Sequence, residues 1–173
     1  RAVDADFVYR QVPQLAPGFA GALWQADLAN VRNPRLMQAL RARLLQFDAF
    51  TLHEHCAVES LLRDGDAVVG VQCPVGRIEA DAVVLCAGAW SGDWLQQAGL
   101  TLPVEPVKGQ MLLYRMTPGW LPSIVMARGR YAIPRRDGHI LIGSTLEYKG
   151  YDKRTTDEAL ASLRASAQAL LPD

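Results

Sequence analysis

The sequence feature that most constrains the fold is an apolar run near the middle of the chain. Residues 80–87, ADAVVLCA, do not alternate apolar with polar side chains, and Gly88 follows them directly. An extended segment without alternation is typical of a strand that is covered on both faces. Because open α/β folds bind ligands where such strands end, the run predicts a ligand-compatible strand end at Gly88.

Helical and strand patterns precede this run. Asn33 can cap a helix, Pro34 suits its first position, and apolar residues then recur at spacings of three and four, so an amphipathic helix is expected over residues 34–47. Strand patterns with intervening turn residues are found over residues 22–28, 50–58, 67–73 and 77–79. The last three segments would form two adjacent hairpins, which make a small antiparallel meander.

After Gly88 the pattern returns to a helix and then to strands. Ser91 can cap a short helix that runs to Ala98, with Gly99 as its stop. Strands are expected over residues 109–114, 131–135 and 140–146, and the pair Asp137 and Gly138 predicts a type I′ hairpin turn between the last two.

The C-terminal segment predicts one more helix. Thr155 and Glu158 have the spacing of a capping box, in which each side chain satisfies a backbone donor of the other. The apolar residues that follow would form its buried face: Leu160, Leu163, Ala167 and Leu170.

Composition excludes several classes of protein. The 173 residues are 50% hydrophobic, enough for a core, and 18 Lys and Arg balance 18 Asp and Glu, so no net charge attracts nucleic acid. No apolar run approaches the roughly 20 residues of a membrane helix. Three cysteines without a CxxC pair argue against a disulfide framework. We therefore expect a soluble cytoplasmic protein without a membrane or nucleic-acid partner; RNA binding through Arg128, Arg130, Arg135 and Arg136 is the weaker alternative.

Spacing alone reveals no catalytic site. In a strand His53 and His55 would point to one face and Cys56 to the other, so we expect no metal site there. Ser91 and Ser144 do not lie in a G-x-S-x-G elbow. The loop GAWSG, residues 88–92, is neither a dinucleotide fingerprint nor a Walker loop.

Three stretches, in order along the chain, resemble motifs of the FAD-dependent amine oxidases of the D-amino-acid oxidase superfamily. They are ADAVVLCAGAWSG (residues 80–92), PVEPVKGQMLLY (103–114) and GRYAIPRRDGHILIGSTLE (129–147). Within the superfamily, LANVRNPRLMQAL and the C-terminal TTDEALASLRASAQALLPD look most like the glycine oxidases of thiamine biosynthesis.

The resemblance implies an α/β and α+β chain that is a central fragment of a two-domain flavoprotein oxidoreductase fold. Residues 31–103 would be part of the FAD domain, and residues 1–30 and 104–173 most of a substrate domain with a mixed or antiparallel sheet. The G-x-G-x-x-G unit for FAD is expected before Arg1, and the W-A-G-(L/F)-R-P segment, whose arginine clamps the substrate carboxylate, after Asp173. The fragment alone is therefore expected neither to bind FAD tightly nor to turn over.

The resemblance also implies residues near the cofactor. Val58 aligns with a position whose backbone meets the adenine ring. Ala87 and Gly88 align with small residues that let the chain pass close to FAD, and Trp90 would pack on the interdomain seam or in a core. Cys86 stands where the family often has alanine, which indicates a small buried residue and not a redox thiol.

Two further residues are implied at the substrate pocket. The Tyr131 hydroxyl would lie near the carboxylate of a bound amino acid, and Leu146 would form an apolar wall. Strand alternation places Tyr131 and Arg135 on one face and Ala132 on the other.

The implied activity is oxidation of glycine or a related small amino acid to the imine and 2-oxo acid, with FAD as cofactor and hydrogen peroxide as product. The alternatives are a sarcosine oxidase or D-amino-acid dehydrogenase of the same superfamily, or a binding module without catalysis. A homo-oligomer of the parent protein is compatible with each.

Overall fold

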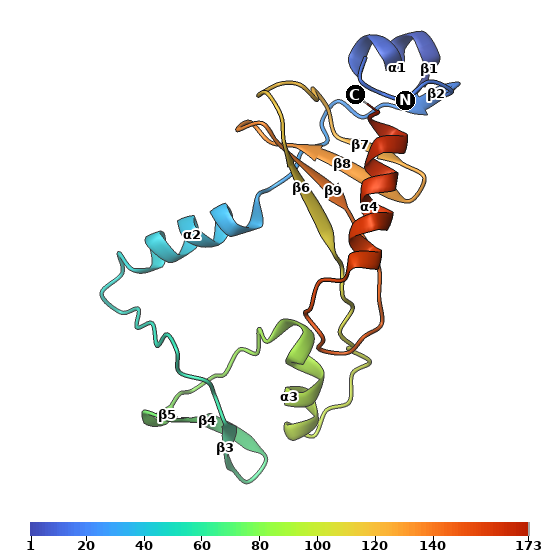
Figure 1. Cartoon of the computed structure of the whole chain (residues 1–173). Coiled ribbons are helices and arrows are strands. Elements are labelled where there is room, and N and C mark those ends of the chain that lie inside the picture. The colour runs from blue at the N-terminus through green and yellow to red at the C-terminus, as the bar shows by residue number, and fades with distance from the viewer. Residues whose placement is uncertain (173) are drawn as a thin grey trace. The chain divides into compact units, whose positions relative to one another are not determined.

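A computed structural model describes residues 1–172 and divides the chain into two compact units (Figure 1). Unit 1 combines Arg1–Asn30 with the chain from Val107 onward, and unit 2 is Val31–Pro106. Every strand pairing among the described residues is antiparallel. The chain is thus a mixed α/β chain with antiparallel sheets, and within residues 1–172 no helix combines the length and apolar character needed to cross a bilayer.

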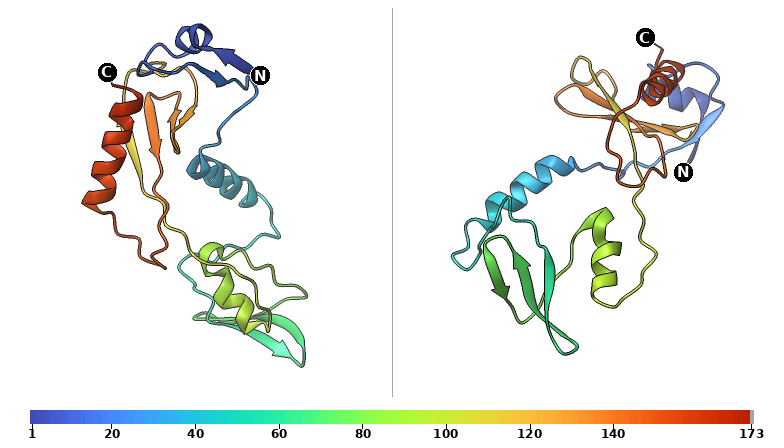
Figure 2. Two further views of the ribbon diagram at one scale, coloured as in Figure 1. Left: turned by 90° about the vertical axis from the view of Figure 1, so that its right-hand side faces the viewer. Right: turned by 60° about the horizontal axis from the view of Figure 1, so that its bottom comes forward.

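Unit 1 is built on a four-stranded sheet with the order β6-β9-β8-β7. Its strands are β6 Met111–Arg115, β7 Val125–Ala127, β8 Arg130–Pro134 and β9 His139–Gly143. Helix α4, Asp157–Leu170, lies along this sheet (Figure 2). The N-terminal part of the unit contains a two-stranded ribbon and a short helix: β1 Ala2–Asp4, α1 Ala5–Gln11 and β2 Gly21–Leu23. Strand β2 is shorter than the predicted segment 22–28.

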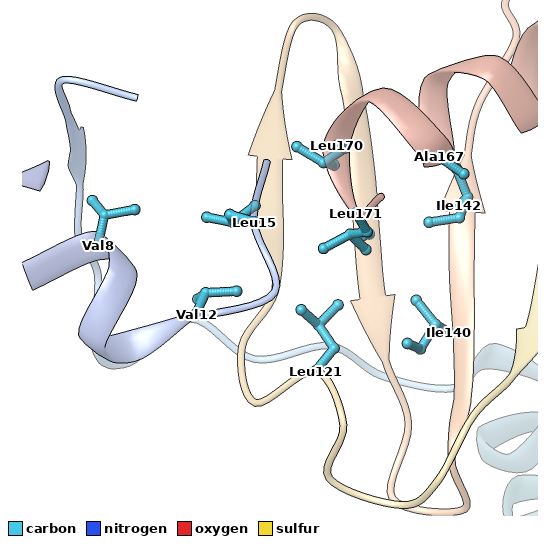
Figure 3. Close-up of a cluster of buried hydrophobic side chains, with 10 residues drawn as sticks. Val8, Val12, Leu15, Leu121, Ile140, Ile142, Ala167, Leu170 and Leu171 are labelled. Carbon is cyan, nitrogen blue, oxygen red and sulfur yellow. The ribbon is translucent and has the colours of Figure 1, made fainter. Parts of the chain in front are cut away.

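The core of unit 1 lies between α4, the sheet and the N-terminal segment. Figure 3 shows Leu170 and Leu171 between the side chains of the N-terminal segment, such as Leu15, and the β9 side chains Ile140 and Ile142. Ala132, the inward residue of β8, is completely buried. The predicted buried face of α4 is confirmed at Leu163, Ala167 and Leu170, whereas Ala159 is buried in place of the half-exposed Leu160. Apolar burial of this kind dominates the stability of a domain.

Two local predictions in unit 1 are wrong in detail. The cap of α4 is Thr156, whose hydroxyl accepts from the Ala159 amide at 3.3 Å. Because Ala159 has no side chain that can return a bond, Gln110 Oε1 accepts from the Thr156 amide at 2.9 Å in place of the expected Glu158. In the β8–β9 hairpin Gly138 has φ +86° but Asp137 does not have positive φ, so the turn is not type I′.

Unit 2 contains the predicted antiparallel meander, β3-β4-β5. Its strands are β3 Ser60–Asp64, β4 Ala67–Cys73 and β5 Gly76–Glu79. Strand β4 has the predicted bounds. Residues 50–58, however, form no strand; the segment that pairs with β4 on this side is β3, which begins at Ser60. Cys73 at the end of β4 is 1% exposed, and this burial, followed by the neighbouring Cys56, raises the pKa of its thiol.

The central apolar run does not form the predicted buried strand. Residues 82–87 belong to no helix or strand, and Val84 is 83% exposed. No strand among residues 1–172 lies beside the run to take its backbone hydrogen bonds. The run therefore has the apolar composition of a buried strand, but no strand of the described chain pairs with it.

The helices of unit 2 are short or exposed. Helix α2, Asn33–Leu44, begins with Asn33 inside the helix, so Arg32 and not Asn33 is its cap. None of its residues is buried. A 3-10 turn η1, Gly88–Trp90, leads into α3, Ser91–Gln97, and Gly99 with φ +80° ends α3 as predicted.

Candidate functional site

Tyr131 lies on the face of the unit 1 sheet opposite to the core. It follows strand alternation, because its neighbour Ala132 points into the core and is fully buried. In the antiparallel register Tyr131 on β8 is paired with Gly143 on β9, and Gly143 is paired with Met111 on β6. These three residues form a row across the sheet, in which the central position has no side chain.

The Tyr131 ring occupies the space above Gly143. A Cβ atom built at Gly143 would overlap the end of that ring, including its hydroxyl oxygen. The hydroxyl then donates to Met111 Sδ on the far strand at 3.4 Å. The phenol therefore reaches across β9, and its hydroxyl lies over the edge strand β6.

Leu146, the second predicted pocket residue, lies outside the strand expected to carry it. Strand β9 ends at Gly143, and Leu146 follows in an irregular segment, with 68% of its surface exposed. Beyond Gly143 the chain still runs beside the segment before β6: the Thr145 amide donates to the Gln110 carbonyl oxygen, and Lys108 and Glu147 form an isolated antiparallel bridge.

A polar network holds the segment that contains Leu146. The buried Gln110 donates through Nε2 to Glu147 Oε1 at 2.8 Å, and its backbone amide donates to Thr145 Oγ1 at 2.9 Å. The Thr145 hydroxyl also donates to Glu147 Oε1 at 2.6 Å. Lys108 Nζ lies 3.8 Å from Glu147 Oε2. With the Gln110–Thr156 bond, the network joins the start of β6, the segment after β9 and the N-terminus of α4.

The charge of Glu147 is stabilised by this network. The hydrogen bond from Thr145, followed by the one from Gln110, lowers the pKa of Glu147 below its ordinary value of 4.5. Glu147 is therefore ionised at neutral pH, and its carboxylate accepts the hydrogen bonds that hold this segment.

Arg130 holds the same loop from its other end. Its Nη1 donates to the Ser144 carbonyl oxygen at 2.8 Å, and its Nε lies 3.4 Å from the Ser166 hydroxyl on α4. The Ser144–Thr145 peptide, one residue beyond Gly143, is thus bonded to a side chain of β8 that also reaches α4.

The four residues predicted near the cofactor all lie in unit 2. Val58 and Trp90 are 39% and 42% exposed. Gly88 has φ +56°, which favours glycine, and no atom lies within 4 Å of where its Cβ would stand. Ala87 and Ala89 flank it with small side chains. The turn thus leaves open space beside a backbone without large side chains, which fits the close approach of a planar cofactor such as FAD.

The histidine region does not have the geometry assumed from the sequence. Residues 50–58 form no strand, and His55 has φ +55°, so alternation does not apply to His53, His55 and Cys56. Among residues 1–172 no three His, Cys, Asp or Glu side chains are grouped as a metal site. Cys86, expected to be buried, is exposed because the run that carries it is uncovered.

A groove of about 1300 Å³ lies in unit 1, lined among others by Trp24, Leu28, Met126 and Arg135. Tyr131 and Leu146 do not line this groove. Sequence alternation placed Arg135 on the face of Tyr131, but the structure brings it to the groove and not to the hydroxyl.

Met111, Gly143 and Gln110 were not identified as site residues from the sequence. Alternation gives the face of each residue, but only the pairing register places Gly143 opposite Tyr131. The glycine that ends the ILIG segment was the available signal, because a glycine in a strand often marks a close approach by another group.

Comparison with known proteins places this chain among flavoenzymes. The family model described as FAD dependent oxidoreductase (DAO) matches residues 1–173. A glycine oxidase of Pseudomonas putida is 56% identical over 172 residues, which are 99% of this chain and 47% of that protein. A glycine oxidase of Pseudomonas aeruginosa is 57% identical over 173 residues, 100% of this chain and 48% of that protein.

Solved structures agree with these relatives. The crystal structure of glycine oxidase from Geobacillus kaustophilus superposes with a TM-score of 0.91 at 27% identity, covering 100% of this chain and 46% of that one. The chain spans about half the length of the curated relatives it matches.

Proposed function

The chain belongs to the DAO family of FAD-dependent oxidoreductases, and on that premise we propose that the full-length protein is a glycine oxidase. It would oxidise glycine or a related small amino acid to the imine and 2-oxo acid, with hydrogen peroxide as the second product. The observation that carries this proposal is the identity above one half, over nearly the whole chain, with two glycine oxidases.

Unit 2 is proposed to be part of the FAD domain, and unit 1 most of the substrate domain. The apolar run and helix α2 support this assignment, because both expose apolar side chains that are normally buried against other parts of a domain. Val58, Ala87, Gly88 and Trp90 would lie at the cofactor. FAD, when bound, supplies the two-electron acceptor that the side chains of this chain lack.

Tyr131 is proposed to bind the substrate carboxylate. Its hydroxyl is on the solvent face of the sheet, and its partner Met111 Sδ is a weak acceptor. The work of the chain at this point is binding and orientation: the hydroxyl fixes the carboxylate, which limits the directions in which the Cα–H bond can point. Leu146 would form the apolar wall, on a segment that the Glu147 network holds in place.

The setting proposed for the enzyme is thiamine biosynthesis in the cytoplasm, as a homo-oligomer of the full-length protein without nucleic-acid or membrane partners. The resemblance of residues 28–40 and 155–173 to the glycine oxidases of thiamine biosynthesis and the three free cysteines support this setting.

The deciding experiment is the absorbance spectrum of the full-length protein without oxygen, before and after glycine is added. Bleaching of a bound flavin by glycine is expected. A flavin bleached only by N-methylglycine or D-alanine would replace glycine oxidase with another amine oxidase of the family, and a protein without flavin would refute the catalytic proposal.

A matched variant tests the role of Tyr131. Tyr131→Phe keeps the ring but removes the hydroxyl, so flavin binding should be unchanged while the KM for glycine rises about tenfold or more, the range expected for a lost hydrogen bond to a charged group. The 173-residue chain alone should bind FAD more weakly than micromolar, and tight binding would contradict the fragment assignment.

A further inference from the structure

Gly143 and Met111 lie on either side of the path that the Tyr131 ring takes across the sheet. We propose that they are positioning residues for the Tyr131 hydroxyl: Gly143 provides the space that the ring fills, and Met111 holds the hydroxyl until a substrate carboxylate replaces it. This inference rests on the proposed function, since it assigns these two residues to the same carboxylate site.

The argument for Gly143 is one of space and not of backbone conformation. Gly143 does not have positive φ, so its backbone does not require glycine. A Cβ there would overlap Cζ, Cε2 and the hydroxyl of Tyr131. All these atoms belong to the far end of one side chain, so an alanine would displace the ring and leave the strand in register. Cross-strand packing of an aromatic ring over glycine is a known way to fill such a gap.

The argument for Met111 concerns the strength of the acceptor. The Tyr131 hydroxyl donates to Met111 Sδ at 3.4 Å, and a thioether sulfur accepts only weakly. A carboxylate accepts roughly twice as strongly as a neutral group. The methionine therefore directs the hydroxyl toward β6 and still releases it to an anionic ligand. Met111 is 52% exposed, which leaves solvent access beside the bond.

The loop on which this arrangement depends is itself restrained. Arg130 on β8 binds the Ser144 carbonyl at 2.8 Å, directly after Gly143. The chain just after Gly143 is thus held by the same strand that carries Tyr131. A small shift of this backbone therefore cannot make room for a Cβ at position 143, and the Tyr131 ring has to move instead.

The test uses the full-length flavoprotein and two readouts. The Kd of acetate, a carboxylate that cannot be oxidised, is measured from the change that it causes in the flavin spectrum, and KM and kcat are measured with glycine. The variants are Gly143→Ala, Met111→Leu and Met111→Gln, each made with Tyr131 present and in a Tyr131→Phe background. Met126→Leu is the control, because Met126 is paired with Tyr131 from β7 but its sulfur makes no hydrogen bond to the hydroxyl among the described contacts.

We expect Gly143→Ala to raise the Kd of acetate and the KM of glycine by about tenfold, with a smaller change in kcat, because ground-state binding is what the hydroxyl provides. Met111→Gln should raise both about threefold or more, since an amide oxygen competes better for the hydroxyl, whereas Met111→Leu, which removes only a weak acceptor, should raise them less. With Tyr131→Phe all of these effects should disappear, as for residues that act through one group.

Equal effects of Gly143→Ala with and without the tyrosine hydroxyl, or of Met111→Gln and Met111→Leu, would overturn the proposal. If Gly143→Ala does not fold, the two Met111 variants decide it. A third readout is independent of turnover: in protein with 13Cζ-labelled tyrosine, Met111→Gln should shift the Tyr131 signal and Met126→Leu should not. A protein that fails with glycine but shows this shift would refute the proposed substrate and keep the positioning role.

Discussion

Helices α4 and α2 share an amphipathic sequence pattern but differ in how much of their apolar face is buried. Both carry apolar residues at spacings of three and four. Four residues of α4 are buried against unit 1, whereas no residue of α2 is buried, and its Leu36, Met37 and Leu40 are 45%, 62% and 47% exposed. An amphipathic pattern thus indicates which face of a helix packs against apolar residues, but it does not identify the part of the protein that supplies them.

The same contrast holds for the two units. Unit 1 has a core formed by residues far apart in the sequence. The hydrophobic residues of unit 2 are largely exposed, and Cys73 is its one buried hydrophobic residue within the described chain. Large exposed apolar faces generally mark surfaces that bind other protein, so unit 2 has the surface expected of an incomplete domain.

The largest expected effect tests the core of unit 1. Leu163 is 1% exposed, so Leu163→Ala should lower the free energy of unfolding by about 2–5 kcal/mol, the usual cost of such a cavity. Urea unfolding of the 173-residue chain, followed by circular dichroism, measures it. Leu36→Ala on α2 is the matched control and should cost less than about 0.5 kcal/mol; equal costs would remove the contrast between the helices.

The second prediction tests whether the exposure of α2 disappears in the full-length protein. Leu40→Ala should have little effect on the stability of the 173-residue chain, since Leu40 is 47% exposed. In the full-length protein the same substitution should cost about 2–3 kcal/mol, the lower range for a buried leucine, because we propose that the FAD domain covers α2. Thermal unfolding of the full-length protein would contradict this if Leu40→Ala and the wild type melted together.

The third prediction compares two glutamines. Gln110→Ala leaves the Thr156 amide without its acceptor and removes one of the two hydrogen-bond donors to Glu147 Oε1, so it should destabilise unit 1 by about 1–2 kcal/mol. The side chain of Gln72 in unit 2 makes one hydrogen bond among the described residues, to the carbonyl oxygen of its neighbour Cys73. Gln72→Ala should therefore cost less than half as much in the same urea titration, and the reverse order would show that the network does not stabilise unit 1.

The smallest expected effect depends on pH. The pKa of Glu147 is lower in the folded chain than its ordinary value of 4.5, so on acidification the unfolded state takes up the proton first. The stabilisation by Glu147 is complete above that ordinary value and is lost as pH falls toward the folded pKa.

Glu147→Gln tests this dependence. The difference in unfolding free energy between the wild type and Glu147→Gln should be constant near neutral pH and shrink below about pH 4.5. Glu79→Gln on the exposed strand β5 controls for the loss of one negative charge. A difference that grows on acidification would contradict the assigned direction of the pKa.

Local patterns predicted most where the partner of an element is near in the sequence. The bounds of β4 and three of the four buried residues of α4 were correct, because hairpin turns and helical spacing are local signals. The first strand of the meander, however, was expected at residues 50–58 and lies at Ser60–Asp64. The run at residues 82–87 was predicted wrongly because a strand exists only when another strand pairs with it, and the run itself contains no information about that neighbour.

The candidate site was predictable only in part for the same reason. Motifs identified Tyr131, and alternation gave its face. The contact of its hydroxyl with Met111 depends on the order β6-β9-β8, in which the hairpin β8–β9 is local but the β6–β9 pairing is not. The helix cap was displaced by one residue because Gln110, far away in the sequence, supplies the acceptor.

The buried thiol of Cys73 can report how often unit 2 opens locally. Its raised pKa and 1% exposure leave almost no thiolate in contact with solvent, whereas Cys86 is exposed. An alkylating reagent should therefore modify Cys86 at once and Cys73 only when the meander opens. The rate at which Cys73 reacts reports how often strand β4 separates from its neighbours, and a slower reaction of Cys73 in the full-length protein would measure how much the rest of the molecule restricts that motion.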